Sequence, residues 1–149
     1  MTSDSDRAWA IFVARAILGI VFFVGGLYKV FIWGPIAHAR VLFVVPYAKT
    51  FLPVWGLWAS GTAIPVVELV AGLLVLVGLW TRPSLFILGA ILVFVTFGHL
   101  LLQSSTSINP FILPRSALLM VVLLAPSDAD VLSVDHLLRV RRRPRLART

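Results

Sequence analysis

The stretch that decides the fold is residues 15–29, RAILGIVFFVGGLYK, in which an apolar run carries one basic residue at each end. Five of its residues follow one another at steps of four, three, four and three, and they are Arg15, Gly19, Phe22, Gly26 and Lys29. That spacing places all five on one face of a single helix. The two charges would lie about 21 Å apart, just inside the edges of a hydrocarbon core about 30 Å thick. The pattern predicts a transmembrane helix whose glycine-lined polar face packs against other helices.

The composition of the whole chain excludes a soluble fold. Of the 149 residues, 60% are hydrophobic and only 13% are charged, and the mean hydropathy is +1.00. A soluble domain of this size cannot bury so much apolar surface, so we expect an integral membrane protein with one domain, residues 1–149. The chain has no cysteine, which excludes thiolate catalysis and iron–sulfur ligation by its own residues.

Four membrane spans are expected, at about residues 9–32, 64–80, 84–102 and 111–125. The intervening residues 34–63 contain three prolines and scattered basic residues. We expect an interfacial or re-entrant segment there, lying over one end of the bundle. The predicted fold class is all-α, a bundle of four transmembrane helices with an interfacial outer loop. An arrangement with three spans, in which the last segment only re-enters the membrane, stays open.

The C-terminal segment predicts an amphipathic basic helix over about residues 128–143 that lies on the membrane surface. Ser127 and Asp130 resemble a capping box at its start, and Pro144 is expected to end it. Residues 131–149 contain six arginines and one acidic residue. Beside a membrane span, this charge favours anionic lipids or another membrane subunit over nucleic acid. The expected contact residues are Arg139, Arg141, Arg142 and Arg143.

The same arginines predict the orientation of the chain. By the positive-inside rule they belong on the cytoplasmic side, and four spans then place the N-terminus there too. We therefore expect a multi-pass protein of the bacterial cytoplasmic membrane with both termini in the cytoplasm.

With this orientation, one polar residue from each span should lie near the outer face. These residues are Lys29, Glu68, His99 and Arg115. An unpaired carboxylate in hydrocarbon costs several kcal/mol, so Glu68 needs a partner, with Lys29 as the first choice and Arg115 as the second. Three interpretations stay open for this outer polar cluster: a salt bridge that fixes the helix register, a ligand pocket, or a proton pathway.

Other polar and small residues receive structural roles. His99 is expected to be a hydrogen-bond partner rather than an axial ligand of a haem or pigment. Arg15 and Arg82 should extend to lipid phosphates at the inner edge. Four glycines are expected to allow close helix approach, namely Gly19, Gly25, Gly26 and Gly72. The pattern predicts no metal site and no catalytic residue.

Three motifs follow one another along most of the chain. The first span carries R-x3-G-x2-F-x3-G-x2-K from Arg15 to Lys29. The second carries P-x2-E-x3-G from Pro65 to Gly72, and then G-x3-R from Gly78 to Arg82. After the last span comes S-x-D, at Ser133 and Asp135. In order and spacing, these motifs resemble those of the DoxX family, and the chain departs from the family in having PSDADVL where a glycine-rich stretch usually precedes S-x-D.

The resemblance implies a four-helix bundle associated with membrane oxidoreductases, and one branch of the family is similar to the quinone-reducing subunits of thiosulfate:quinone oxidoreductase. Two functions stay open. The chain is either a non-catalytic accessory subunit of a larger respiratory or photosynthetic electron-transfer complex, or the quinone-binding subunit of a sulfur-compound:quinone oxidoreductase. In the second, the outer polar cluster would hydrogen-bond the quinone and deliver protons, with electrons supplied by a partner. A transporter is disfavoured because no inverted repeat is visible.

Overall fold

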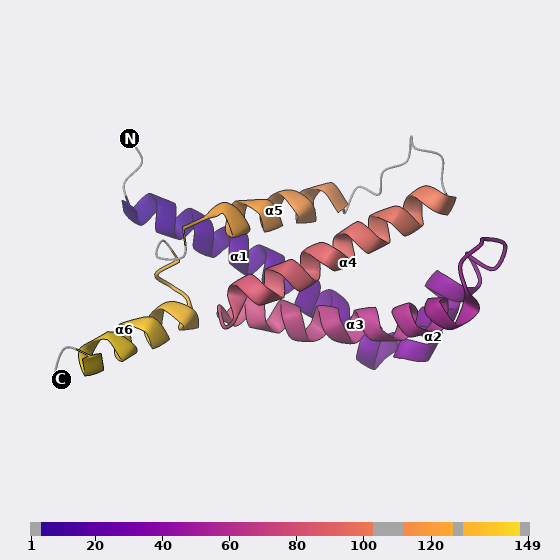
Figure 1. The fold of residues 1–149 in the computed structure, drawn as a ribbon, viewed down its shortest axis with the longest axis horizontal. Helices are drawn as coiled ribbons and strands as arrows, with labels where there is room; N and C mark the ends of the chain where they lie inside the picture. The colour runs from indigo at the N-terminus through magenta and orange to yellow at the C-terminus, as the bar shows by residue number, and fades with distance from the viewer. Residues whose placement is uncertain (1–3, 103–111, 127–129, 147–149) are drawn as a thin grey trace.

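The structure is a computed structural model that describes residues 4–102, 112–126 and 130–146, with side chains up to residue 140. Every regular element in these ranges is helical. The elements are α1 (Asp4–Leu27), η1 (Tyr28–Trp33), α2 (Pro35–Ala39), η2 (Arg40–Val44), α3 (Val54–Val77), α4 (Thr81–Leu102), α5 (Ile112–Leu124) and α6 (Val134–Leu146), where η1 and η2 are short π-helical segments. Figure 1 shows α1, α3, α4 and α5 as a bundle, with α2 at one end and α6 leaving from the other.

Three of these helices are long and apolar enough to cross a membrane: α1 together with η1, α3, and α4. This confirms an all-helical membrane protein. Helix α5 has 13 residues, which at 1.5 Å per residue is about 20 Å, shorter than the hydrocarbon core. A fourth spanning helix is therefore not confirmed, although α5 packs against α1 and α4.

The second long helix begins earlier than expected. Helix α3 starts at Val54 rather than near residue 64, directly after Pro53, whose backbone is extended (ψ 133°). It continues through Pro65, as membrane helices often do when neighbouring groups compensate the lost hydrogen bond. The expected outer segment is thus shorter than residues 34–63, because residues 54–63, its last third, belong to α3.

Helices α1 and α3 make the closest contact of the bundle through glycine. A Cβ atom on Gly19 would lie 2.6 Å from the backbone of Leu76, and one on Gly72 would lie 2.4 Å from the backbone of Phe23. A Cβ on Gly26 would lie 2.5 Å from the backbone of Leu69, also in α3. The expectation for Gly25 was wrong, since a Cβ there would have no atom within 4 Å. Three of the four glycines therefore lie where the two backbones touch.

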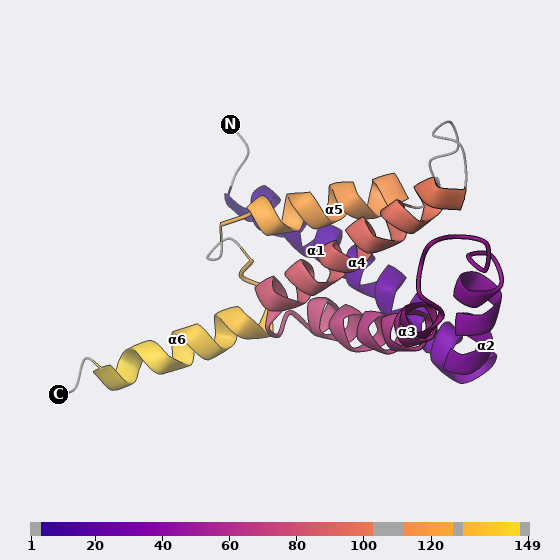
Figure 2. The ribbon, with the colours of Figure 1, turned by 45° about the vertical axis from the view of Figure 1, so that its right-hand side comes forward.

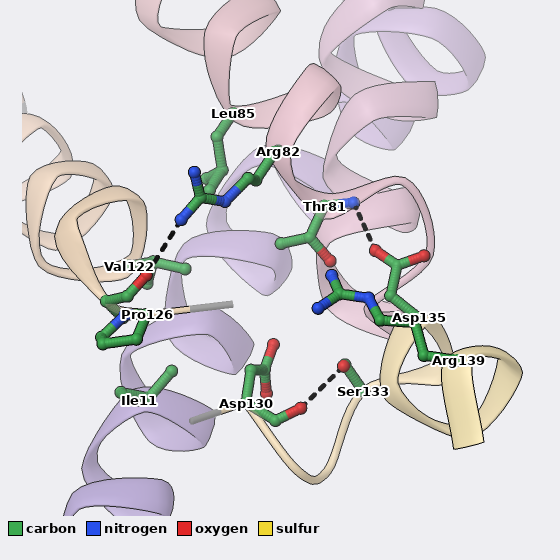
Figure 3. A pocket seen from close by; sticks show the side chains of 11 residues that line it. Ile11, Thr81, Arg82, Leu85, Val122, Pro126, Asp130, Ser133, Asp135 and Arg139 are labelled. Carbon is green, nitrogen blue, oxygen red and sulfur yellow. Dashed lines mark hydrogen bonds between the residues drawn. The ribbon is translucent and has the colours of Figure 1, made fainter. Parts of the chain in front are cut away.

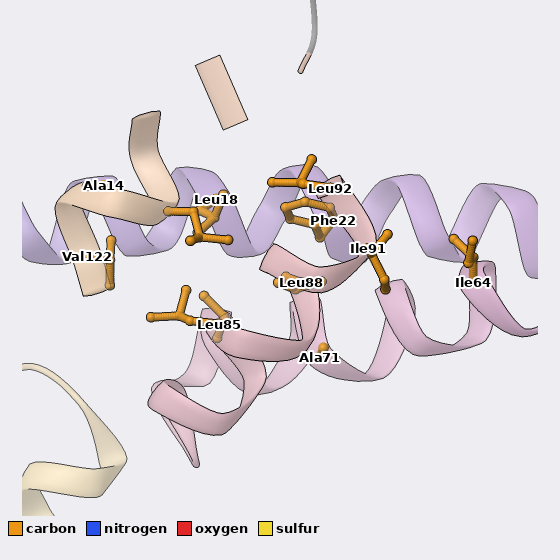
Figure 4. Packing of buried hydrophobic residues seen from close by; sticks show 12 residues of the cluster. Ala14, Leu18, Phe22, Ile64, Ala71, Leu85, Leu88, Ile91, Leu92 and Val122 are labelled. Carbon is orange, nitrogen blue, oxygen red and sulfur yellow. The ribbon is translucent and has the colours of Figure 1, made fainter. Parts of the chain in front are cut away.

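The core lies between α1, α3, α4 and α5. Figure 4 shows apolar side chains from these helices pointing toward one another. The members buried most completely are Leu18, Phe22, Val75, Leu85 and Leu88. Most other large apolar side chains on the outside of α1, α3 and α4 are exposed, as expected of helices that face lipid.

One end of the bundle is covered by the segment after η1. The chain turns at Gly34, where φ is +79°, and Pro35 begins α2. Helix α2 and η2 then pack along the first half of α3, and a Cβ on Gly61 would lie 2.6 Å from the backbone of Ala39. We call residues 40–53 the strap, because they connect α2 to α3 across this end.

At the opposite end, Arg15 holds three parts of the chain together. Its side chain is only 1% exposed, and it donates to the carbonyls of Val75 and Leu76 at the end of α3, at 2.8 Å each. It also donates to the carbonyl of Leu132 at 3.0 Å, and its Nε lies 3.1 Å from Asp130 Oδ2. The expected extension of Arg15 to lipid phosphates is therefore wrong. Carbonyls at the negative end of a helix dipole and a carboxylate replace the phosphate.

Arg82 lies near this end but on the surface. Its side chain is exposed, and it donates to the carbonyl of Ala125 at 3.2 Å. Figure 3 shows the Arg82 side chain, with this bond as a dashed line.

Ser133 and Asp135 begin α6 and tie it to the start of α4. Ser133 Oγ accepts from the backbone N–H of His136 at 3.2 Å, as an N-cap does. The Asp135 carboxylate accepts from the backbone N–H groups of Trp80 and Thr81 at 3.0 and 2.9 Å; Figure 3 shows the bond to Thr81.

The expected start of α6 near residue 128 and its end at Pro144 were both wrong. The helix begins at Val134, where Ser133 is the N-cap, and it continues through Pro144 to Leu146. Ser127 lies outside the described residues. Figures 1 and 2 show α6 extending away from the bundle.

Candidate ligand-binding site

A cavity of about 440 Å³ lies where η1, the strap, α3, α4 and α5 meet, at the end of the bundle away from Arg15. Its volume is in the range of pockets that hold a small organic ligand. Most of its wall is apolar, and the polar side chains that line it are Lys29, His38, Tyr47, Glu68, His99 and Arg115. A few convergent polar groups in an apolar cavity are typical of a binding site for a largely apolar molecule.

The structure brings the whole predicted outer polar cluster to this cavity, with one residue each from η1, α3, α4 and α5. Lys29 Nζ donates to Glu68 Oε2 at 2.6 Å. The Glu68 side chain is 6% exposed and that of Lys29 is 28% exposed. The two interpretations of these residues as a salt bridge and as a pocket are therefore compatible, because the ion pair itself forms part of the cavity wall.

Lys29 is positioned by an irregular part of the first helix. It lies in η1, the π-helical continuation of α1. A π-helical turn rotates the following side chains relative to a regular helix, and such turns are frequent at functional sites. The regular spacing of residues 15–29 alone does not show this turn.

His99 and Arg115 lie on the α4 and α5 sides of the cavity. His99 Nδ1 donates to the carbonyl of Val95 in its own helix at 2.9 Å, which fixes the direction of the ring. The Arg115 guanidinium lies over the ring of Phe22, 5.6 Å from its centre, a distance at which a cation and an aromatic face attract each other.

Sequence reasoning missed His38 and Tyr47. His38 is 2% exposed, and its Nδ1 donates to the carbonyl of Gly61 at 2.8 Å. Burial lowers the pKa of His38 below 6.5, so the ring is neutral at pH 7 and its Nε2 is an acceptor. Burial also raises the pKa of Tyr47 above 10, which keeps its hydroxyl protonated. Both lie in residues 34–63, where spacing does not show which side chains turn inward.

This set of groups suits a neutral ligand that carries both acceptors and donors. Lys29 and Arg115 are donors, Glu68 is an acceptor, and neutral His38 accepts at Nε2. Among the residues that the structure describes, no group of three His, Cys, Asp or Glu side chains is close enough to hold a metal ion.

Comparison with protein families gives a match to one family model, DoxX, over residues 10–100. This match covers more than half of the chain, including the motifs of α1 and α3. The chain belongs to the DoxX family. Comparison with curated proteins and with solved structures finds no match.

DoxX proteins are membrane proteins generally associated with oxidoreductase-related functions. In this DoxX protein, the matched region includes Lys29, Glu68 and His99, and it includes the strap. Arg115 and the C-terminal contacts of Asp130 and Asp135 lie beyond it. The ion pair of the cavity thus belongs to the part of the chain that the family model describes.

Proposed function

We propose that this DoxX protein is the quinone-binding membrane subunit of a larger oxidoreductase. The observation that supports this proposal is the apolar cavity of about 440 Å³ with the Lys29–Glu68 ion pair in its wall. A quinone is a flat apolar ring with two carbonyl acceptors, and its reduced form carries two hydroxyl donors. The cavity offers groups that match both forms.

The chemistry assigned to the cavity is proton transfer and hydrogen bonding. Reduction of a quinone consumes two electrons and two protons and forms two hydroxyl groups. Lys29 would donate to a quinone carbonyl and pass on the two protons in turn, regaining each from water, since its side chain is 28% exposed. Glu68 and the neutral ring of His38 would accept hydrogen bonds from the quinol hydroxyls. The electrons would come from a redox-active partner subunit that oxidises a sulfur compound.

The same proposal includes the orientation of the protein in its membrane. Helices α1, α3, α4 and α5 alternate in direction, so the start of α1 and the end of α5 lie at the same end of the bundle (Figure 1). This supports a location of both termini on the cytoplasmic side of a bacterial inner membrane. Helix α6 would then contact anionic lipids or the partner subunit through Arg139 and the arginines that follow it.

The test is quinone binding by the purified protein in lipid nanodiscs. We expect Glu68→Gln and Lys29→Gln to weaken the binding of decylubiquinone about tenfold, since each variant loses charge-assisted hydrogen bonding worth about 1.4 kcal/mol. The matched control is Lys49→Gln, which removes an exposed lysine of the strap that does not line the cavity. Size-exclusion chromatography would check that each variant is folded.

Wild-type protein that binds no quinone, or variants that bind as tightly as the wild type, would contradict the proposal. Either result would favour the second candidate, a non-catalytic accessory subunit. That function needs no ligand in the cavity and predicts only that other membrane subunits co-purify with the chain in mild detergent.

A further inference from the structure

One wall of the cavity is also part of the outer surface of the protein. Leu42 of the strap and Phe94 and Phe97 of α4 line the cavity, and the exposed fractions of these side chains are 44%, 45% and 49%. Helix α4 is long enough to cross the membrane, so its exposed apolar side chains face lipid. The cavity therefore borders the bilayer between the strap and α4.

Tyr47 connects the strap to α4 at this wall. A Cβ on Gly98 would lie 2.7 Å from the Tyr47 hydroxyl oxygen, so the hydroxyl rests on the α4 backbone where only glycine leaves room. The Tyr47 ring also stacks on Phe43, with ring centres 6.4 Å apart. The base of the strap is held differently, by His38 and Ala39 against Gly61 of α3. Movement of the Tyr47 side chain would thus widen the wall without moving that base.

We infer that the ligand of this cavity is a long-tailed amphiphile that enters from the bilayer between the strap and α4. Its polar head lies beside Lys29 and Glu68, its apolar tail lies along Phe94 and Phe97, and the contact between Tyr47 and Gly98 opens for exchange. The inference rests on the proposed function and adds to it an entry route and a binding surface for the tail.

The first test separates the tail from the head group. We would measure the affinity of nanodisc-embedded protein for decylubiquinone, which has a ten-carbon tail, and for duroquinone, which has none. In Phe94→Ala/Phe97→Ala, decylubiquinone should bind at least tenfold more weakly while duroquinone binding changes less than twofold. The matched control is Phe86→Ala on the same helix, which removes a phenylalanine that is 63% exposed and does not line the cavity.

Equal weakening of both quinones in the double variant, or no weakening of either, would overturn the inference and leave the proposed function intact. Failure of the wild type to bind either quinone would overturn both.

The second test addresses the entry route and uses the absence of cysteine from the chain. The double variant is Tyr47→Cys/Gly98→Cys. A side chain at residue 98 would clash with the Tyr47 hydroxyl, but the first substitution removes that hydroxyl. A reductant-cleavable bismaleimide would then join the two positions. Cross-linking should slow the release of decylubiquinone at least tenfold, and reduction should restore the rate.

The control is the same double variant modified with N-ethylmaleimide, which adds comparable bulk without a bridge. Release from the fully cross-linked protein at the rate of this control would overturn the entry route and show that the ligand exchanges elsewhere.

Discussion

At the residue scale, the cavity combines an ion pair with a histidine that is held neutral. Lys29 Nζ lies 2.6 Å from Glu68 Oε2. His38 is buried beside this pair, and its Nδ1–H donates to the backbone carbonyl of Gly61. An ion pair of this kind contributes little net stability once desolvation is counted, whereas removing one partner is costly. The pair therefore adds little net stability, but each of the two charges depends on the other for its partner.

His38 gives a pH dependence that can be measured. Burial, with a smaller contribution from Lys29, lowers its pKa in the folded protein, while the Gly61 carbonyl and Glu68 raise it less. Below pH 6.5 the unfolded chain binds a proton that the folded chain excludes, so stability falls as the pH falls from 6.5 toward the lowered pKa. The slope from one such group is at most about 1.4 kcal/mol per pH unit. Thermal unfolding in detergent between pH 7.5 and 4.5 would show it.

The variant His38→Gln should flatten this part of the pH profile. His136→Gln is the matched control, since it makes the same substitution in α6, outside the cavity. An unchanged profile in His38→Gln would show that His38 is not the group responsible.

At the element scale, the contact between α1 and α3 determines how close Lys29 and Glu68 can come. Gly72 lies one turn beyond Glu68 on α3 and touches the backbone at Phe23. Where two helices meet through glycine, association depends on close packing rather than on the hydrophobic effect, because lipid is as apolar as the side chains.

Two glycines of this pair of helices should respond in opposite ways to alanine. Gly72→Ala places a Cβ 2.4 Å from the Phe23 nitrogen, which forces the helices apart, and it should lower the free energy of unfolding by about 1–3 kcal/mol. Gly25→Ala places its Cβ in open space and should be neutral or stabilising by up to about 1 kcal/mol. Unfolding of both variants in detergent would compare them, and equal effects would contradict this account of the packing.

At the scale of the whole molecule, the end opposite the cavity joins the N-terminal helix, the α3–α4 turn and the C-terminal segment. Arg15 contacts the end of α3 and Asp130, and Asp135 accepts from the first N–H groups of α4. Gly78, with φ +76°, leaves room for Ser133 and Arg15 in the turn. The direction of α6 is therefore set by contacts with the bundle.

Arg15→Lys should lower the stability of this end of the bundle, and the segments that Arg15 joins should become less stable together. A lysine keeps the charge but cannot match the several bonds of the guanidinium, and we expect a loss of about 2–4 kcal/mol. Hydrogen exchange should increase together in residues 77–85 and 130–138. Arg82→Lys, at an exposed position, should change stability by less than about 0.5 kcal/mol. Faster exchange in only one of the two segments would contradict the prediction that they open together.

Much of the fold could be predicted from local patterns. Hydropathy identified a membrane protein, and the four-three spacing correctly placed Arg15, Gly19, Phe22 and Gly26 on the buried face of α1. The same patterns predicted one acid and three basic residues at one depth, but they could not show the strap closing over them. Helix ends were less predictable, because the start of α3 depends on packing against α2 and the start of α6 depends on the Ser133 cap.

By itself, the sequence determined that this chain is an all-helical membrane protein, that one face of its first helix is polar and glycine-lined, and that it resembles the DoxX family. These properties depend on hydropathy and on spacing within one helix, which are local. Only the tertiary structure decided that Arg15 pairs with Asp130 instead of lipid, and that His38 and Tyr47 line the cavity beside Lys29 and Glu68. Such pairings join distant parts of the chain, and they form only where backbone packing brings those parts together.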